Sequence, residues 1–365
     1  MIARVWKFDP LRVHALYLVR MAVCVPCVRR CNESLPGPTS AGCSAGRRRC
    51  RIRGVAVGEL RISEKKSRAF TSGLPQCLAD SEVLAFNVVS GCPVDCHYCK
   101  YQPKDPTKAD VVHLYTLLGQ QVRDELASMA RRDCLPKMVL FNTITESFFG
   151  NALANRVAGE VLEALFAAGV YVNLSTKGIM PRTVMEIASL HPHLVTVTVN
   201  VASLSESFHR LFEPRVATPE DRFQVIRRLR ELGVPVRGRI EPLIPTENDS
   251  PKDVELLLAR FREAGVRDVV VAYLHYGADV ANRLARRVSR VQTALLGPWY
   301  RGPNGETVHL VDKEYRKRKY ADFKQIAQKY SMRLLVCACR NADIYSGRCF
   351  VMPAPIKAPE KKVLF

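Results

Sequence analysis

Three cysteines lie close together on one short segment of the chain. They are Cys92, Cys96 and Cys99, with the spacing C-x3-C-x2-C. Three thiolates on one tight loop can bind three irons of a [4Fe–4S] cube, because cysteine thiolate is the usual ligand of such clusters. The fourth iron would then lack a protein ligand and could bind another molecule. This spacing therefore predicts an open iron–sulfur cluster.

The alternatives for this segment are a zinc ion or purely structural cysteines. A structural zinc ion normally has four protein ligands. His97 could be the fourth, but it lies between two of the cysteines, so its binding would strain the loop. The next cysteine, Cys134, lies beyond a predicted helix. The pattern favours the cluster over zinc.

A second cysteine group lies near the C-terminus. Cys337, Cys339 and Cys349 have the spacing C-x-C-x9-C, which could supply an auxiliary iron–sulfur cluster or a zinc site. The segment MRLLVCAC around the first two is typical of a buried strand, and free cysteine is commonly buried. Structural thiols are therefore the alternative here.

The elements that must position these cysteines alternate regularly along the chain. Short β-rich runs are predicted at 83–90, 137–143, 171–176, 195–200, 234–244 and 269–276. Helical runs are predicted at 112–132, 155–169, 181–190, 219–233 and 252–265, with glycine C-caps at Gly169, Gly233 and Gly265. Strands joined by such helices form right-handed βαβ units and a parallel sheet. Six units are too few for the usual eight-fold barrel, so we expect an α/β fold with an open, partial (β/α)6 barrel.

Polar residues alternate along the third, fourth and fifth predicted strands. Alternate residues of a strand share one face. The residues sharing that face are Asn173, Ser175, Lys177, Thr196, Thr198, Asn200, Arg237, Arg239 and Glu241. Parallel strands are normally apolar on both faces, so these polar rows predict a polar cavity inside the barrel. The alternative is an antiparallel sheet with one face in solvent.

The cysteine segment, C-x3-C-x-aromatic-C after the first strand, resembles the radical S-adenosylmethionine superfamily. Three further segments resemble the group around spore photoproduct lyase and its DNA repair photolyase-like relatives. They are STKG at 175–178, FEPRVATPEDR at 212–222 and RIEPLIPTEND at 239–249. The resemblance covers about residues 68–276, more loosely the C-terminal tail, and not residues 1–58.

The resemblance implies a reaction as well as a fold. Cys92, Cys96 and Cys99 would bind the [4Fe–4S] cluster, whose open iron would chelate the amino and carboxylate groups of S-adenosylmethionine. One electron, from an external flavodoxin- or ferredoxin-type donor, would cleave the sulfonium C–S bond. Methionine would leave, and a 5′-deoxyadenosyl radical would take a hydrogen atom from the substrate. The cofactors do this chemistry, and the protein positions and shields them.

The resemblance also implies which side chains surround the cofactors. Tyr98 would pack beside the cluster. Thr143 with Glu146 would receive the methionine ammonium, although the superfamily often has Gly-Gly-Glu where this chain has Asn-Thr-Ile-Thr-Glu at 142–146. Ser175 and Lys177 would meet the carboxylate.

Three more residues are assigned to the cofactor or the substrate in the same way. Asn200 would bind the ribose. Arg239 and Glu241 would face the interior near the adenosyl group or the substrate, with a buried ion pair as the alternative.

The hydrogen donor is not assigned. Spore photoproduct lyase uses a cysteine just past the second strand, where this chain has Asn142 and Thr143. This departure argues against the same lyase reaction. Tyr273, Tyr276, Glu241 and a C-terminal cysteine are the candidates for catalysis.

The chain is strongly basic, with 55 Lys and Arg against 35 Asp and Glu. Arg283, Arg286, Arg287 and Arg290 recur at helical spacing and share one face. A second basic run lies at 316–319. Such surfaces suit phosphate backbones, so nucleic acid is a candidate partner. The alternative is an ordinary solvated face.

Residues 1–58 differ from the rest of the chain, with eleven basic residues and only Asp9 and Glu33 as acids. They could form a targeting segment, a metal site through Cys24, Cys27 and Cys31, or a poorly ordered extension. After them we expect a lead-in at 59–80, the partial barrel at 81–296 and a C-terminal α/β appendage at 297–365.

Composition excludes several classes of protein. A hydrophobic content of 47% excludes a mostly disordered chain. No apolar run reaches the roughly 18 residues of a spanning helix, so a membrane protein is not expected. Thirteen unevenly spaced cysteines suit reduced, metal-binding thiols of the cytoplasm. Besides the enzyme, one further hypothesis stays open, a non-catalytic nucleic-acid-binding protein that holds zinc or an iron–sulfur cluster.

Overall fold

The computed structural model describes residues 59–71, 82–102, 111–287, 299–301, 307–341 and 343–344. The predictions for residues 1–58, Arg290 and Cys349 fall outside the described residues, as does the side chain of Arg287. No helix in the described part of the chain has the length and apolar character needed to cross a membrane.

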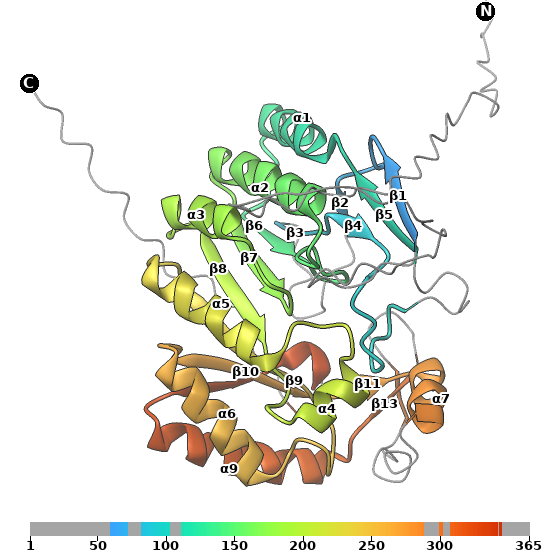
Figure 1. Cartoon of the computed structure of the whole chain (residues 1–365), viewed down its shortest axis with the longest axis vertical. Coiled ribbons are helices and arrows are strands. Elements are labelled where there is room, and N and C mark those ends of the chain that lie inside the picture. Colours follow the sequence, from blue (N-terminus) through green and yellow to red (C-terminus); the bar gives the residue numbers. More distant parts are fainter. Residues whose placement is uncertain are drawn as a thin grey trace, which may run out of the picture. The chain divides into compact units, whose positions relative to one another are not determined.

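A mixed sheet forms the centre of the described fold (Figure 1). Its strand order is β14-β10-β9-β8-β7-β6-β3-β2. The strands are β2 (Phe70–Thr71), β3 (Val83–Phe86), β6 (Met138–Phe141), β7 (Tyr171–Thr176), β8 (Val195–Asn200), β9 (Val236–Leu243), β10 (Asp268–Tyr273) and β14 (Arg333–Val336). All neighbours pair in parallel except β2 and β3. Each of the six predicted strands contributes to this sheet, although the first, at 83–90, divides into β3 and a short strand of another sheet. The open barrel is confirmed, and the antiparallel alternative is wrong.

Helices follow the parallel strands in alternation, as predicted. They are α2 (Ala152–Ala167), α3 (Arg182–Leu190), α5 (Pro219–Glu231) and α6 (Pro251–Glu263). The three predicted glycine C-caps are confirmed, because Gly169, Gly233 and Gly265 all have positive φ angles. Thr218 begins α5 with a capping box that includes Asp221. Local sequence signals therefore define where these helices begin and end.

The predicted helix at 112–132 is wrong in its first turn. Residues Val111–Tyr115 form strand β5, and helix α1 covers only Leu118–Arg131. The run VVHLY buries Val112 and Leu114 on one face, which is the two-residue period of a strand. Strand β5 pairs with β1 (Glu59–Ser63) and β4 (Val89–Ser90) in a separate three-stranded sheet.

Two further elements differ from the prediction. Helix α4 (Glu206–Phe212) was not predicted, although Ser205 caps it. The predicted strand at 269–276 divides into β10 and β11 (His275–Tyr276). Strand β11 pairs with β13 (Thr307–Leu310), which pairs with β12 (Trp299–Arg301), in a third sheet beside helix α7 (Ala278–Arg287).

Strand register aligns the predicted polar rows. Ser175 of β7 lies opposite Thr198 of β8, which lies opposite Arg237 of β9. One row further along, Asn200 lies opposite Arg239. Apolar side chains flank these rows on the same face, including Leu140 of β6 and Val270 of β10, in a cluster separate from the main core. The inner face is therefore mixed in polarity.

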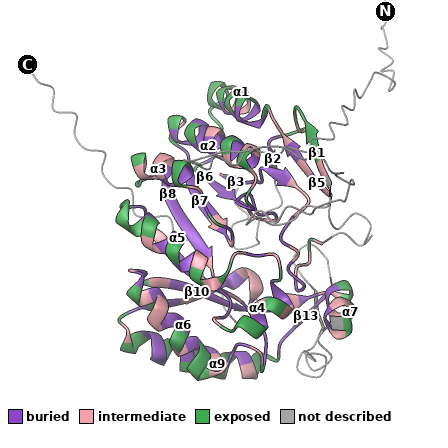
Figure 2. Ribbon diagram, in the orientation of Figure 1, coloured by how far each residue is buried: buried purple, intermediate pink, exposed green. Residues whose placement is uncertain are grey.

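The other face of the sheet packs against the helices (Figure 2). Its strand residues belong to the main hydrophobic core together with apolar side chains of α2, α5 and α6. Val197, Ile240 and Leu258 are fully buried there. This face follows the ordinary pattern of a parallel sheet covered by helices.

The C-terminal segment extends the barrel sheet instead of standing apart from it. Strand β14 pairs in parallel with β10, and α9 (Lys313–Lys329) contacts α6. Arg316 is only 1% exposed and donates to Val311 O and to the side chains of Asn341 and Asp343. The predicted basic run at 316–319 is therefore not a uniform surface, because this arginine is an internal structural residue.

Lys66 lies half-buried between β1 and β2. Its Nζ donates to Asn87 O at 2.5 Å and lies 5.2 Å from the Tyr115 ring centre. Burial lowers the pKa of Lys66 from 10.5 to about 8. Burial therefore disfavours the charged form in the folded protein.

This shift predicts a pH-dependent stability. Between the folded and unfolded pKa values of Lys66, about 8 and 10.5, the unfolded chain binds more protons. The free energy of unfolding should therefore rise with pH across that window. Relative to the Lys66→Met variant, wild type should gain about 1–3 kcal/mol over this range. Denaturant unfolding at several pH values checks this. Parallel curves for the two proteins would contradict it.

Candidate active site

The cysteine loop follows strand β4 directly. Gly91 has φ +83°, and a Cβ at this position would lie 2.2 Å from Val111 O, so the turn into the loop requires glycine. Cys96 is buried, and Cys92 and Cys99 are half-buried. The N–H of Cys99 donates to Cys96 O at 3.0 Å, which closes a tight turn. The loop thus brings three thiols to one place.

The thiols are close enough to act on one another electrostatically. Burial raises the pKa of Cys92 to about 12, although the backbone N–H of Val94 opposes this shift. Burial also raises the pKa of Cys96, and the other two thiols add to the rise, while the Lys177 charge opposes it. Thiolates bind metal and thiols do not, so a cationic centre is what would deprotonate these sulfurs.

The three thiols of the loop are the donor type that a [4Fe–4S] cube binds. Among the described residues, no three His, Cys, Asp or Glu side chains form a group that could hold one metal ion. The thiolates of a cube bind different irons and therefore lie farther apart than ligands of one ion. Cys92, Cys96 and Cys99 would hold such a cluster.

His97 is committed to the backbone of helix α4. Its Nδ1 donates to Leu211 O at 2.6 Å, and its backbone N–H donates to Phe212 O at 2.9 Å. Its Nε2 lies 3.8 Å from a carboxylate oxygen of Asp95. These contacts orient the His97 ring, and His97 as the fourth ligand of a zinc ion stays an alternative prediction.

Arg283 of α7 holds the opposite side of the loop. Its Nε donates to His97 O at 2.8 Å, and its Nη2 donates to Cys99 O at 2.5 Å. Val280 and Leu284 of the same helix are buried. Arg283 therefore does not belong to an open phosphate-binding face, which corrects the prediction for this residue. Arg286 on the same helix is exposed.

Replacing Arg283 by leucine is expected to loosen the cysteine loop. The variant loses two hydrogen bonds from a charged donor, which together contribute about 1–3 kcal/mol. We expect a lower melting temperature and faster loss of bound iron from the reconstituted protein. Arg286→Leu is the matched control and should change neither property. Equal effects of the two variants would contradict this role of Arg283.

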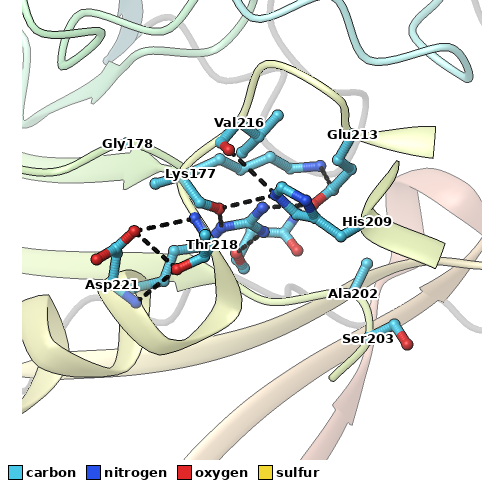
Figure 3. Close-up of polar contacts among 12 residues, drawn as sticks. Lys177, Gly178, Ala202, Ser203, His209, Glu213, Val216, Thr218 and Asp221 are labelled. Atoms are coloured by element: carbon cyan, nitrogen blue, oxygen red, sulfur yellow. Dashed lines mark hydrogen bonds and ion pairs between the residues drawn. The ribbon is translucent and has the colours of Figure 1, made fainter. Parts of the chain in front are cut away.

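A network of buried charges lies beside the loop, and Figure 3 shows two of its members, Lys177 and Glu213. Glu213 Oε1 accepts hydrogen bonds from the Tyr98 hydroxyl and from Lys177 Nζ, the latter at 2.9 Å. Lys177 Nζ also lies 4.6 Å from the Tyr98 ring centre. Glu213 Oε2 pairs with Arg222 Nη2 at 2.5 Å. The network places Tyr98, and with it the cysteine loop, against the ends of β7 and α4.

The charges of this network hold Glu213 ionised. Burial alone would raise the pKa of Glu213, but the Arg222 and Lys177 charges keep it well below its ordinary value. Arg222 is fully buried and also donates to Asn200 O at 2.9 Å and Ala217 O at 2.8 Å. Glu213 and Arg222 were not singled out from the sequence, although both lie in the FEPRVATPEDR segment.

Glu146 is occupied by donors of the chain itself. Its carboxylate accepts from Lys177 N at 2.7 Å, Phe148 N at 2.9 Å and Thr176 Oγ1 at 3.0 Å. It therefore ties the loop after β6 to the end of β7. This corrects the prediction that Glu146 receives an ammonium group. Thr143 Oγ1 accepts from Asn87 Nδ2 at 3.0 Å, and its role toward a ligand stays a prediction.

Asn200 offers an unused acceptor on the inner face. Its Nδ2 donates to Glu241 O at 2.8 Å. Its Oδ1 is buried and has no hydrogen-bond partner in the described structure. A buried acceptor without a donor is costly, so this atom fits a ligand hydroxyl such as that of a ribose. Ser175 is half-buried on the same face.

Arg239 and Glu241 form an ion pair on the inner face, each about 14% exposed or less. Arg340 Nε adds a second contact to Glu241 at 3.0 Å. Burial would raise the pKa of Glu241, but the two guanidinium groups lower it. The ion pair considered as an alternative is therefore present, and its position beside Asn200 keeps it near the predicted cofactor site.

Two predicted catalytic candidates lie away from this face. Tyr273 belongs to the main core, where its hydroxyl donates to Asp249 Oδ2 at 2.8 Å and its ring meets Tyr315. Tyr276 is buried and stacks on His309 in the third sheet. Tyr273 lies on the face of β10 that joins the main core, so it is removed from the candidates.

The chain is similar to known proteins in both sequence and fold. Residues 86–258 match the family model of the Radical SAM superfamily. The uncharacterized protein ORF301 of Acidianus two-tailed virus is 24% identical over 242 residues, which are 61% of this chain and 79% of ORF301. The uncharacterized protein Rv2578c of Mycobacterium tuberculosis is 27% identical over 201 residues, 52% of this chain. That match spans 58% of the mycobacterial protein's length.

Solved structures of spore photoproduct lyase share the fold. The complex with dinucleoside spore photoproduct has a TM-score of 0.62 at 14% identity and covers 78% of this chain and 87% of that chain. A mutant with bound AdoMet and dinucleoside spore photoproduct has a TM-score of 0.60 at 13% identity, with the same coverage of both chains. At these identities the similarity concerns the partial barrel.

Proposed function

Because its residues 86–258 match the family model of the Radical SAM superfamily, we propose that this chain cleaves S-adenosylmethionine reductively to act on a nucleotide or nucleic-acid substrate. The observation that carries the proposal is the cysteine loop. Three thiols meet there between a backbone anchor on α4 and the Arg283 guanidinium. A [4Fe–4S] cluster with S-adenosylmethionine would supply a 5′-deoxyadenosyl radical at this place.

Residues of the chain bind the cluster and orient the cofactor. Cys92, Cys96 and Cys99 bind iron as thiolates. Tyr98 covers one side of the loop, and Glu213 holds its hydroxyl so that the ring keeps one orientation. Asn200 Oδ1 accepts a ribose hydroxyl, because it is buried without a donor.

The methionine carboxylate needs a positive partner, which Lys177 supplies. Its Nζ donates to Glu213 and to the Tyr98 hydroxyl, and its side chain is 18% exposed. Ser175 adds a hydroxyl on the same strand. Because Glu146 already binds groups of the protein itself, Thr143 is the remaining residue that we expect to bind the methionine ammonium group.

The inner face suits an anionic substrate. Arg237, Arg239 and Arg340 approach it with Glu241 as the nearby carboxylate. A phosphate-bearing substrate would complement this excess, and the net charge of +20 agrees with it. The solved complex of spore photoproduct lyase with dinucleoside spore photoproduct also supports this class.

The same lyase reaction is not proposed. Asn142 and Thr143 stand where that enzyme has its cysteine donor. Asn142 has φ +62°, and its Oδ1 accepts from Ser147 Oγ at 2.5 Å, so the loop after β6 is built as a rigid polar turn. An amide has no weak X–H bond to donate, so another residue must supply hydrogen.

The proposed reaction also needs an electron donor and a reducing cellular compartment. A flavodoxin- or ferredoxin-type protein would deliver single electrons. Free thiols at Cys92, Cys96 and Cys99 require a reducing compartment such as the cytoplasm.

Anaerobic reconstitution tests the proposed function. The protein reconstituted with iron and sulfide should absorb broadly near about 400 nm, because thiolate-to-iron charge transfer occurs there. Dithionite with S-adenosylmethionine should then yield 5′-deoxyadenosine and methionine. Stoichiometric zinc with no cleavage would overturn the proposal in favour of a zinc-bound nucleic-acid-binding protein.

A further inference from the structure

Two thiols of the C-terminal segment are in contact with each other. Cys337 Sγ and Cys339 Sγ lie 3.3 Å apart. Strand β14 ends at Val336, and the short 3-10 turn Ala338–Arg340 brings the two side chains to one side. Cys337 is fully buried and Cys339 is half-buried. A thiol pair at this distance can close to a disulfide with a small movement.

Two guanidinium groups lie beside the pair. Arg239 Nη2 lies 3.7 Å from Cys337 Sγ. Arg340, which follows Cys339 directly, contacts both Glu241 and the His275 ring. Positive charge beside a cysteine stabilises its thiolate and raises its reactivity. The pair is therefore not an inert part of the core.

The pair faces the proposed reaction site. Cys337 belongs to the inner-face cluster with Val270 and Ala272, and Cys339 packs against it. Glu241 connects this region to Asn200 through its backbone carbonyl. Lys100, next to Cys99, acts electrostatically on His275. The thiols thus lie between the inner face and the end of the cysteine loop.

We propose that Cys337 and Cys339 form a redox-active dithiol in which Cys339 donates a hydrogen atom to a carbon radical on the substrate. This inference rests on the proposed function, which supplies that radical. The S–H bond of Cys339 breaks, a C–H bond forms on the substrate, and a thiyl radical remains on the sulfur. One electron from the external donor and one proton from solvent restore the thiol.

The second sulfur explains why a pair is present. A thiyl radical in contact with a thiolate shares its odd electron with that sulfur, which stabilises and confines the radical. Cys337, held by Arg239, supplies this partner. Cys339, with its partial exposure, is the sulfur that a substrate can reach.

The dithiol is tested first without cofactors. Purified protein is equilibrated in glutathione buffers of increasing oxidised fraction, alkylated and digested. The peptide that contains both residues should lose two hydrogens and escape alkylation in oxidising buffer. The Cys337→Ser variant should alkylate Cys339 in every buffer. Independent alkylation of both cysteines of wild type throughout would overturn the dithiol, as would one tightly bound metal ion that Cys339→Ser loses.

The donor role is tested in deuterated water without substrate, so that the 5′-deoxyadenosyl radical itself is the probe. Thiol hydrogens exchange with solvent, so wild type should place deuterium in 5′-deoxyadenosine. Cys339→Ala should form the product without this label, and the control Cys134→Ala should retain it. Equal labelling by Cys339→Ala and wild type overturns the donor role. If no protein forms 5′-deoxyadenosine, the proposed function fails and the donor role with it, while the disulfide assay still decides the dithiol.

Discussion

Replacing Cys96 by alanine is expected to remove most of the bound iron and abolish cleavage of S-adenosylmethionine. Cys96 is the central and most buried of the three cysteines. The described loop holds no fourth cysteine that could replace it. Substitutions that only disturb residues around metal ligands commonly cost about 10–100-fold, so loss of a ligand should cost more than about 100-fold. Iron content, absorbance near about 400 nm and 5′-deoxyadenosine formation measure the effect.

The matched control is Cys134→Ala. Cys134 is exposed, lies beyond α1, and its Sγ contacts only Met129 O among the described residues. This variant should keep the iron content and turnover of wild type. A Cys96→Ala protein with a full iron complement and undiminished cleavage would refute the cluster assignment.

Replacing Glu213 by alanine is expected to cause the largest loss of stability. Glu213 is 2% exposed and balances two buried cations, Arg222 and Lys177. Removing one partner of a buried ion pair leaves an uncompensated charge, which costs about 3–5 kcal/mol. Tyr98 also loses its acceptor, so the reconstituted variant should hold iron less tightly. Denaturant unfolding and iron retention measure the two effects.

A second glutamate provides the control for Glu213. Glu220 pairs with Arg227 and Arg260 at similar distances, but it is 53% exposed. Glu220→Ala should therefore cost only about 0–1 kcal/mol. Equal losses from the two variants would contradict the assigned role of the buried network.

The lowered pKa of Glu213 has a consequence for acid stability. Its folded-state pKa lies below the ordinary value of 4.5, so its contribution is present above that pH. The contribution is lost as the pH falls further toward the folded-state pKa. The stability difference between wild type and Glu213→Gln should therefore shrink in acid.

Local sequence patterns were sufficient to predict the repeated strands and helices of the fold. The alternation of β-branched runs with capped helices predicted the six parallel strands, and positive φ angles at Gly169, Gly233 and Gly265 agree with it. Where two patterns overlap, the sequence was ambiguous. Val111–Tyr115 reads as the start of a helix until its pairing with β1 is known, because a short apolar run carries both periods.

Site residues on strands were predicted better than residues on loops. Asn200 and Arg239 lie opposite each other on the inner face, since strand alternation and register place them there. Glu213, Arg222 and Arg283 were missed or misread, because their partners are distant in sequence. Arg283 looked like surface charge, yet it binds a loop 184 residues away.

By itself, the sequence determined the chemistry and the repeating architecture of this protein, because thiol spacing, glycine caps and strand periodicity are local properties. Only the tertiary structure decided which charges are buried and paired, which carboxylates remain open to a ligand, and that two C-terminal thiols meet beside Arg239. The physical reason is that burial and ion pairing depend on neighbours brought together by the sheet, and the energy of a charge changes with those neighbours more than with its position along the chain.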